Sequence, residues 1–312
     1  MIMNAVLKYV SITCTWLIAS ALSLQGVERE IIRDSNVQNG LMLLSASPGK
    51  RIVYGILPGF NCNTNAVWDL AQWSSKYPLN VVPQKPHNRS IQYTNVAKSI
   101  ILGQPDSDGV SMAVYGSIEY AGRARKQDEP WVHLLLQQDF KQPSALNELS
   151  AAKFHIEARL KSSFKVETSD YSPGLHAAQF QVFFSIQNLN RKSAGFGEYL
   201  WFGIPLYDDR HRSPKAHKTQ DTGGTKMFIF TPSGETYTQQ SAHDKQWITI
   251  DKDLLPLVKE GLKTAWDAGF LKDSKSFADY FIAGMNIGWE VPGIFDVEIQ
   301  FRRLSLVEVK VK

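Results

Sequence analysis

The sequence predicts an all-β protein, built as a two-sheet antiparallel β-sandwich of the jelly-roll type with one inserted α-helix. The first observation is that several segments alternate apolar and polar residues with a period of two. Such alternation is expected where one face of a sheet packs and the other meets water. The second is that clusters of Gly, Pro, Asn and Asp separate these segments. Only one late segment, near 253–269, has helical spacing instead.

Four segments show the alternation most clearly, and each has an apolar set at every second residue. The apolar sets are Val110, Met112, Val114, Ile118 and Tyr120; Phe154, Ile156, Ala158 and Leu160; Phe180, Val182, Phe184 and Ile186; Phe295, Val297, Ile299 and Phe301. The other face of the first segment carries Tyr115 and Glu119. We expect the apolar sets to fill the space between two sheets.

The helical segment has start and stop signals as well as helical spacing. Asp253 is a candidate N-cap, and Pro256 falls in the first turn, where its missing N–H is harmless. Leu255, Val258 and Leu262 follow on one face, and Gly269 is placed to end the helix. We expect this helix to pack against the edge of the sandwich.

The N-terminus predicts export. Lys8 precedes an uncharged run of sixteen residues, 9–24, which a charged stretch follows. This is the pattern of a secretory signal peptide, assigned to residues 1–26. The run is shorter than the ~20 residues of a spanning helix, although a retained membrane anchor is the alternative. We therefore expect a secreted or periplasmic protein that has no membrane contact after the signal is removed.

The rest of the chain is predicted to form one domain. Residues 27–66 mix apolar residues with turn-forming clusters and are interpreted as an irregular lead-in. From residue 67 to 312 no Pro/Gly/Ser-rich linker divides the sequence, so this part is assigned to a single β-sandwich. The length of 312 residues alone would also allow two domains.

Composition and motifs exclude several functions. The net charge of +4 is modest, and no clustered basic stripe is visible, so nucleic acid is not an expected partner. The sequence has no P-loop and no GxGxxG, HEXXH or CXXC motif, so we expect no cofactor and no metal site.

One polar strand face predicts a saccharide-binding groove. Gln179, Gln181, Phe183 and Gln187 share a face, and Trp201 with its neighbour Tyr199 is predicted to face the same side. Aromatic rings can cover the apolar faces of sugars, while amides bind hydroxyls. Tyr115 and Arg123 are further candidate substrate-binding residues. A solvated outer sheet face would explain the glutamines equally well.

The candidate catalytic residues are carboxylates and one histidine. Glycoside hydrolysis needs two carboxyl groups ~5–5.5 Å apart for retention or ~6.5–9.5 Å for inversion. Glu119 and Glu290 are the predicted pair, with Glu198 in reserve. For a polysaccharide lyase, His133 is the candidate base. The segment 208–226 carries a net charge of +2, which would suit an acidic glycan or describe an ordinary solvated loop.

The aromatic-rich strands, the late helix and the Gly288-Trp289-Glu290 segment together resemble the concanavalin A-like jelly-roll superfamily. This resemblance implies a secreted carbohydrate-active protein, since the superfamily includes glycoside hydrolases, polysaccharide lyases and carbohydrate-binding domains. The sequence lacks the E-x-D-x-x-E, R-x-E-x-R and Q-x-H signatures of such enzymes, so no catalytic residue is transferred.

Two functional hypotheses follow. The first is a secreted polysaccharide-degrading enzyme, a glycoside hydrolase or a polysaccharide lyase, that binds its glycan on the concave face of the jelly roll. The second is a non-catalytic carbohydrate-binding or structural cell-surface protein. In both, the expected partner is a polysaccharide or an oligosaccharide.

Overall fold

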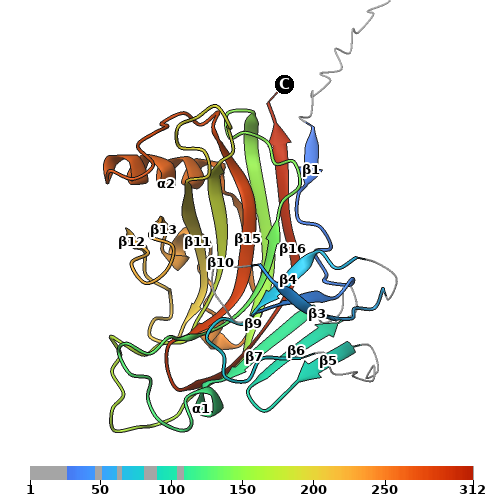
Figure 1. The fold of residues 1–312 in the computed structure, drawn as a ribbon, viewed down its shortest axis with the longest axis vertical. Helices are drawn as coiled ribbons and strands as arrows, with labels where there is room; N and C mark the ends of the chain where they lie inside the picture. Colours follow the sequence, from blue (N-terminus) through green and yellow to red (C-terminus); the bar gives the residue numbers. More distant parts are fainter. Residues whose placement is uncertain (1–26, 46–50, 62–64, 81–89, 104–108, 312) are drawn as a thin grey trace, which may run out of the picture.

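Two β-sheets pack face to face in the computed structural model, which describes residues 27–45, 51–61, 65–80, 90–103 and 109–311 (Figure 1). The predicted signal peptide lies outside the described residues. Within them, sheet A has seven strands in the order β14-β9-β16-β7-β6-β5, and β1 pairs with β16. The strands of sheet A are β14 (Ile248–Asp253), β9 (Leu149–Lys165), β16 (Phe295–Lys310), β7 (Val110–Tyr115), β6 (Lys98–Gly103), β5 (Ser90–Thr94) and β1 (Glu28–Glu30).

Sheet B has nine strands in the described chain, in the order β12-β13-β11-β10-β15-β8-β4-β2-β3. They are β12 (His217–Gln220), β13 (Phe228–Thr231), β11 (Tyr199–Asp208), β10 (Gln179–Asn188), β15 (Tyr280–Val291), β8 (Val132–Asp139), β4 (Trp68–Ala71), β2 (Leu41–Leu44) and β3 (Val53–Leu57). The pairs β11–β13 and β2–β4 are parallel, and the other pairs are antiparallel. The predicted all-β two-sheet sandwich is confirmed.

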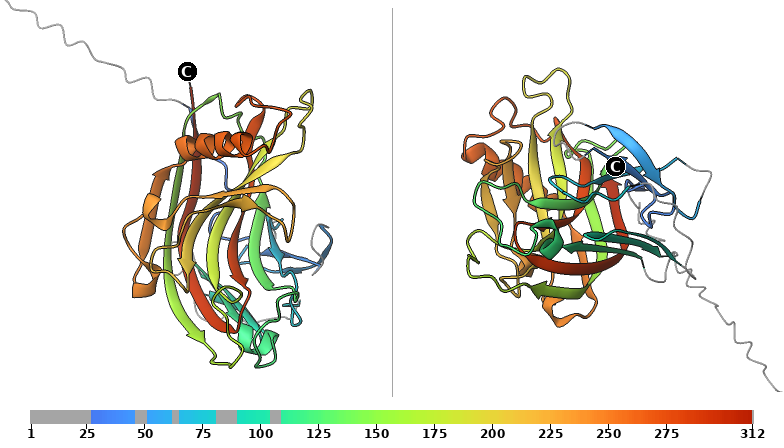
Figure 2. Two further views of the ribbon diagram at one scale, coloured as in Figure 1. Left: turned by 90° about the vertical axis from the view of Figure 1, so that its left-hand side faces the viewer. Right: turned by 60° about the horizontal axis from the view of Figure 1, so that its bottom comes forward.

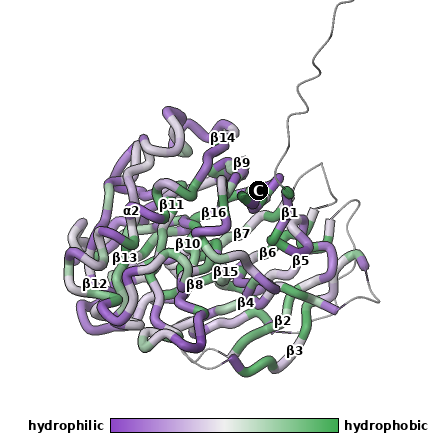
Figure 3. The backbone as a smooth tube through the Cα atoms, turned by 90° about the horizontal axis from the view of Figure 1, so that it is seen from above, coloured by the Kyte–Doolittle hydropathy of each residue, from purple (hydrophilic) through white to green (hydrophobic). Residues whose placement is uncertain are grey.

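The core lies between the two sheets and uses the predicted apolar faces. The alternating sets on β9, β10 and β16 are all buried, whereas Gln179, Gln181 and Phe183 on the opposite face of β10 are half-buried. Figure 3 shows hydrophobic stretches through the central strands and hydrophilic stretches in the outer loops. Period-two alternation therefore identified correctly which face of these strands is turned inward.

The first alternating segment is partly helical, which corrects its prediction as a strand. Strand β7 ends at Tyr115, and the short helix α1 (Gly116–Glu119) follows. An ideal Cβ on Gly116 would lie 2.6 Å from the carbonyl oxygen of Phe295. Glycine thus permits the close backbone approach at which the chain leaves the sheet. Because of this turn, Glu119 does not share a strand face with Tyr115.

Residues 27–66 are not an irregular lead-in where they are described. They contribute β1 to sheet A and β2 and β3 to sheet B. The parallel pairing of β2 with β4 extends sheet B beyond β8. These strands are only three to five residues long, so each offers too few alternating positions for a clear period-two signal.

Helix α2 (Leu255–Asp267) lies where the predicted inserted helix was placed. Asp253 accepts a hydrogen bond from the Leu255 amide at 3.0 Å, and Gly269 follows the helix with a φ of +84°. Figure 2 shows the helix lying across one end of the strands. Its buried face includes Val258 and Leu262. Two 3₁₀ turns, η1 (Gly234–Thr236) and η2 (Ala242–Asp244), precede β14.

Candidate functional site

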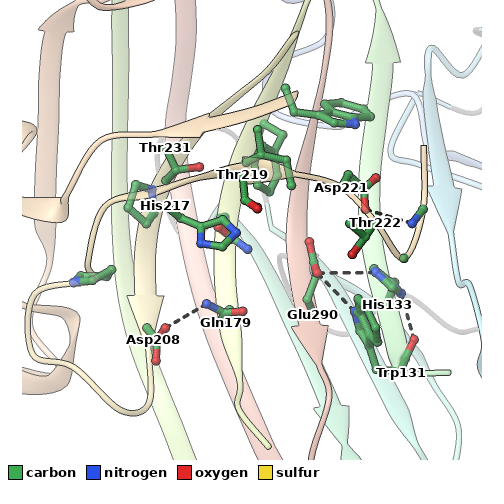
Figure 4. A pocket seen from close by; sticks show the side chains of 18 of the residues that line it. Trp131, His133, Gln179, Asp208, His217, Thr219, Asp221, Thr222, Thr231 and Glu290 are labelled. Atoms are coloured by element: carbon green, nitrogen blue, oxygen red, sulfur yellow. Dashed lines mark hydrogen bonds and ion pairs between the residues drawn. The ribbon is translucent and has the colours of Figure 1, made fainter. Parts of the chain in front are cut away.

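A groove of about 1360 Å³ lies on the outer face of sheet B. Four adjacent strands, β11, β10, β15 and β8, form its floor. Its lining includes Gln179, Gln181 and Phe183 of β10, Glu290 of β15 and His133 of β8. A segment that includes β12 forms the opposite wall (Figure 4). The polar face of β10 thus lines a concavity over the first three of its alternating positions.

Four polar residues form a row across the floor, one on each of four neighbouring strands. Asp208 on β11 pairs with Gln179, Gln179 pairs with Glu290, and Glu290 pairs with His133 on β8. Neighbouring strands are about 4.8 Å apart, so the backbones of Asp208 and Glu290 lie roughly 10 Å apart, on either side of Gln179. The row brings two carboxylates, an amide and an imidazole to one end of the groove.

A β-bulge explains how Asp208 joins this row. Phe180 pairs with Tyr207, but the next residue, Gln181, pairs with Pro205, so β11 has one extra residue at Leu206. A bulge reverses which face the following side chains meet. Tyr207 is therefore buried in the core, and the Asp208 carboxylate points to the groove side, where it accepts a hydrogen bond from Gln179 Nε2 at 2.8 Å.

Glu290 lies among hydrogen-bond donors. Trp131 Nε1 donates to Glu290 Oε2 at 3.3 Å, and His133 Nε2 lies 3.6 Å from the same oxygen. His133 Nδ1 lies 3.0 Å from the Trp131 carbonyl oxygen, so a protonated imidazole finds an acceptor at each nitrogen. Burial acts to raise the pKa of Glu290, but His133 and Trp131 outweigh it, and the net pKa lies below its usual value.

Asp208 is also held as an anion. Burial acts to raise its pKa, but Arg210 and Gln179 reverse this effect and lower the pKa overall. Arg210 contacts both carboxylate oxygens, at 2.9 and 2.7 Å. Asp208 is thus a carboxylate neutralised by a bidentate guanidinium, whereas Glu290 faces an imidazole.

Four aromatic side chains contribute flat surface to the groove. Trp73 meets the His133 ring edge-on at 5.5 Å, and Trp131 stacks on the same ring with the centroids 5.8 Å apart. Phe183 contacts Trp201 edge-on at 6.0 Å. Phe183 has room for its ring because it pairs with Gly203, where a Cβ would lie 2.8 Å from that ring. The polar row therefore lies beside rings that could cover a sugar face.

Glu119 does not line this groove. It ends α1, beside sheet A, with its side chain fully buried against Lys98. Its carboxylate also accepts hydrogen bonds from Ser75 Oγ and from the Lys76 amide, each at 2.8 Å. The chain turns into α1 instead of continuing β7, and so it does not bring Glu119 together with Glu290.

Glu198 and Tyr199 also lie outside the groove lining. Glu198 directly precedes β11, and burial, with the nearby charge of Asp273, raises its pKa. Tyr199 lies beside Trp201 on β11, and its ring meets the Trp201 ring edge-on at 5.0 Å. Gln187 donates to the Gly197 carbonyl at 2.9 Å, beyond the end of the groove.

Tyr115 and Arg123 do not contact the groove directly. Tyr115 ends β7 in sheet A, where it pairs with Asp296. Arg123 donates to both carboxylate oxygens of Glu129 at 2.8 Å, and Glu129 itself lines the rim of the groove. Arg123 therefore neutralises a rim carboxylate and is held in that contact.

Sequence reasoning missed Asp208, Trp73 and Trp131 as groove residues. Trp131 has the same parity as His133 and lies two residues before it, so period-two alternation alone could have identified it. No such signal exists for Asp208, whose direction depends on the bulge at Leu206. Trp73 reaches the groove from the loop after β4.

The cations of the 208–226 segment are mostly engaged within the protein. Arg210 binds Asp208, Arg212 binds Asp244 at 2.6 Å, and Lys218 lies 3.9 Å from Glu260. Lys226 Nζ contacts the Thr222 carbonyl oxygen. The net positive charge of this segment is therefore not presented as a free cationic surface.

No group of three or more His, Cys, Asp or Glu residues is arranged to hold a metal ion within the described ranges. No helix in the described part of the chain combines the length and the apolar character that crossing a membrane requires.

Comparison with known proteins finds similarity in structure alone. No family model matches the sequence, and no curated protein matches it either. Similar solved structures include endoglucanase cel12A from Rhodothermus marinus (TM-score 0.39, 9% identity, covering 72% of this chain and 93% of that one). The native family 12 xyloglucanase from Bacillus licheniformis has a TM-score of 0.41 and 10% identity, with 77% and 99% of the two chains covered. The family 11 xylanase from Neocallimastix patriciarum has a TM-score of 0.37 and 8% identity, with 74% and 98% covered.

The described strands form the two-sheet sandwich that the alternation in the sequence predicts. At such TM-scores and identities, the likenesses carry no argument about activity, and the site has to be judged from its own residues.

Proposed function

We propose that this protein binds a polysaccharide or an oligosaccharide in the groove on sheet B. The observation that carries the proposal is the combination of aromatic rings and polar groups in one concavity of about 1360 Å³. Trp73, Trp131 and Trp201 offer flat apolar surface, while Gln181 and Asn286 offer amide donors and acceptors for hydroxyl groups. A ligand with alternating apolar faces and hydroxyl edges fits this lining.

The charges of the groove favour a glycan without acidic groups. Its lining contains five carboxylates and two Lys or Arg side chains, and the carboxylates are Asp128, Glu129, Asp208, Asp221 and Glu290. One of the two cations, Arg210, is already bound to Asp208. A uronate chain would meet net like charge here. Elimination would also develop negative charge at the uronate, and the excess of lining carboxylates disfavours it.

The binding proposal is tested with glycan arrays and calorimetry on the purified chain, residues 27–312. We expect neutral glucans, xylans or mannans to bind and polyuronates to bind more weakly. Trp201→Ala should weaken binding, whereas Trp247→Ala, in which the lost ring lies against Arg302 and Arg159 of sheet A, should not. Failure of every neutral and acidic glycan to bind would refute the proposal.

Polysaccharide degradation is the second candidate function, and the row containing Asp208 and Glu290 favours it. Two carboxylates flank the site at a backbone separation of roughly 10 Å, a distance that leaves room for a glycosidic bond and a water molecule. Both carboxylates have lowered pKa values, so neither is suited to donate a proton. His133 is then the candidate general acid, and the Glu290 carboxylate is its ion-pair partner.

Degradation and simple binding are separated by product analysis. New reducing ends without ultraviolet absorbance from an unsaturated uronate indicate hydrolysis, and that absorbance indicates elimination. Glu290→Gln and His133→Asn should abolish either activity. Binding without products would leave the protein as a carbohydrate-binding module, the alternative that the sequence already raised.

Export of the chain is part of the proposal and rests on the leader predicted over residues 1–26. Fractionation of cells that produce the full-length chain would test it. We expect a shortened product outside the cytoplasm, and N-terminal sequencing should find its first residue near position 27.

A further inference from the structure

The hairpin of β12 and β13 crosses the mouth of the groove. We call residues 217–227 of this hairpin the strap. In Figure 4 the segment carrying His217, Thr219 and Asp221 passes in front of the strands that carry Gln179 and Glu290. Strap and sheet residues line the same groove. A ligand on the sheet B floor would therefore lie beneath the strap.

The turn of the strap contacts one aromatic ring of the groove and approaches a second. Trp201 Nε1 donates a hydrogen bond to Thr225 Oγ1 at 3.0 Å. An ideal Cβ at Gly223 would lie 3.5 Å from Cη2 of Trp131, so one added carbon atom would bring the turn into contact with that ring. Trp201 lies on β11, and Trp131 directly precedes β8. The strap thus starts at the sheet edge beyond β11 and reaches the far wall beside β8.

Contacts within the strap hold its turn in one shape. Asp221 accepts hydrogen bonds from the Gly224 amide at 3.0 Å, from the Thr225 amide at 2.6 Å and from Thr225 Oγ1 at 2.8 Å. A Cβ at Gly224 would lie 2.6 Å from the Asp221 carboxylate, so glycine permits this approach. The side chain of Gln220 donates to the Lys226 carbonyl at 2.9 Å. The turn is an organised element with its own hydrogen bonds.

From this geometry we propose that the strap makes the groove selective for saccharide chain ends and short oligosaccharides. This inference rests on the proposed glycan-binding function. The strap bonds to Trp201, and the gap between Gly223 and Trp131 has room for only about one more carbon atom. The interior of a long chain therefore cannot be laid onto the floor from the side. A chain with a free end can enter along the groove, beneath the strap. Thr225 and Gly223 are then specificity-determining residues.

The test compares probes that differ only in whether their ends are free. The probes are linear dodecasaccharides of cellulose, xylan and mannan type, biotinylated at both ends and measured with and without saturating streptavidin. Association rates are followed by stopped-flow tryptophan fluorescence on the chain 27–312. We expect streptavidin to reduce the association rate at least tenfold, because the blocked ends cannot pass beneath the strap.

Two variants make the strap itself the tested element. In the first, Asn-Gly replaces residues 222–226, which leaves Asp221 and Met227, already joined by a backbone hydrogen bond, to flank a two-residue turn. The second, Thr225→Val, removes only the hydroxyl that Trp201 contacts. Thr264→Val is the matched control on α2, where the hydroxyl bonds to the Glu260 carbonyl. Circular dichroism checks that each variant folds.

We expect the variant with the shortened strap to bind blocked and free probes at nearly equal rates. Thr225→Val should show a smaller ratio of free-probe to blocked-probe association rate than the wild type. Thr264→Val should show the wild-type ratio. Equal rates for blocked and free probes in the wild-type protein would overturn the inference and leave the binding function intact. If the wild type bound none of the probes, the inference would fail, and the glycan arrays would decide the binding function separately.

Discussion

At the scale of single residues, the groove is organised around Glu290. Its carboxylate faces the Trp131 indole N–H and the His133 ring, and these two contacts lower its pKa although burial opposes them. The His133 ring contacts the rings of both Trp73 and Trp131, and these contacts hold its orientation. The charge at the centre of the site is therefore positioned by aromatic side chains that also offer surface to a ligand.

The lowered pKa of Glu290 predicts how stability changes with pH. The folded-state pKa lies below the usual 4.5, so the ionised form stabilises the fold above that pH. This contribution is lost as the pH falls through the folded-state value. Glu290→Gln should reduce the free energy of unfolding by roughly 1–2 kcal/mol at neutral pH. In urea titrations, the difference from wild type should stay constant near neutral pH and shrink as the pH falls below the usual value of 4.5. A difference that stayed constant or grew on acidification would contradict this account.

Trp131 is predicted to contribute strongly to affinity, because its ring lines the groove, bonds Glu290 and lies beside the strap. Trp131→Ala should weaken saccharide binding by about tenfold or more, the usual effect of removing a buried aromatic contact. Isothermal titration calorimetry measures the change. Trp131→Phe should recover part of the affinity, since it restores the ring without the N–H. A Trp131→Ala variant with unchanged affinity would place the ligand elsewhere.

At the scale of elements, a buried ion pair fixes the loop that carries Trp73. Lys98 on β6 and Glu119 on α1 are fully buried together. Burial lowers the pKa of Lys98, while the charge of Glu119 opposes this effect. Glu119 also binds Ser75 and the Lys76 amide, close to Trp73 in the chain. Glu119, which the sequence predicted as a catalytic residue, thus holds the loop that carries Trp73 in place.

Breaking this ion pair should therefore affect both stability and the groove. Glu119→Gln leaves Lys98 charged and buried, which should reduce the free energy of unfolding by about 3–5 kcal/mol. The double variant Lys98→Met, Glu119→Leu should be less destabilised than the sum of the single variants. Guanidinium titrations measure these values, and near-ultraviolet circular dichroism reports on the tryptophans near the loop. Additive effects would show that the two side chains are not coupled.

At the scale of the whole molecule, strand β1 joins the start of the described chain to sheet A by pairing with the end of β16. Arg29 on β1 donates to Glu308 of β16 at 2.6 Å, and Glu308 is fully buried. Ser144 completes the site by donating its amide at 3.0 Å and its hydroxyl at 2.7 Å to the same carboxylate. The segment expected to be an irregular lead-in is therefore part of the sandwich, and it supplies the partner of a buried charge.

Arg29→Met should consequently destabilise the whole sandwich by about 3–5 kcal/mol, because it leaves the Glu308 carboxylate buried without its cation. Thermal and urea unfolding of the chain 27–312 measure the loss. Lys153→Met is the matched control: its ion pair with Glu28 is exposed, so the change should stay within about 0.5 kcal/mol. Similar effects for the two variants would mean that β1 is a peripheral element.

The sequence by itself determined the fold class and the direction of most strand faces. Phe180, Val182 and Phe184 are buried, and Gln179 and Gln181 line the groove, because side-chain direction alternates along any regular strand. The alternation of side-chain direction is local, so it can be inferred from neighbouring residues in the sequence. It holds only while the strand stays regular, and so it could not foresee where an irregularity reverses the faces.

Only the tertiary structure decided what the site contains. The extra residue at Leu206 directs Asp208 to the groove, and the turn at Gly116 removes Glu119 from it. The reach of the strap to Trp131 depends on how far sheet B extends beyond β11. Bulges, chain reversals and contacts between distant segments arise from pairing across the whole molecule, where backbone hydrogen bonds and core packing must be satisfied together.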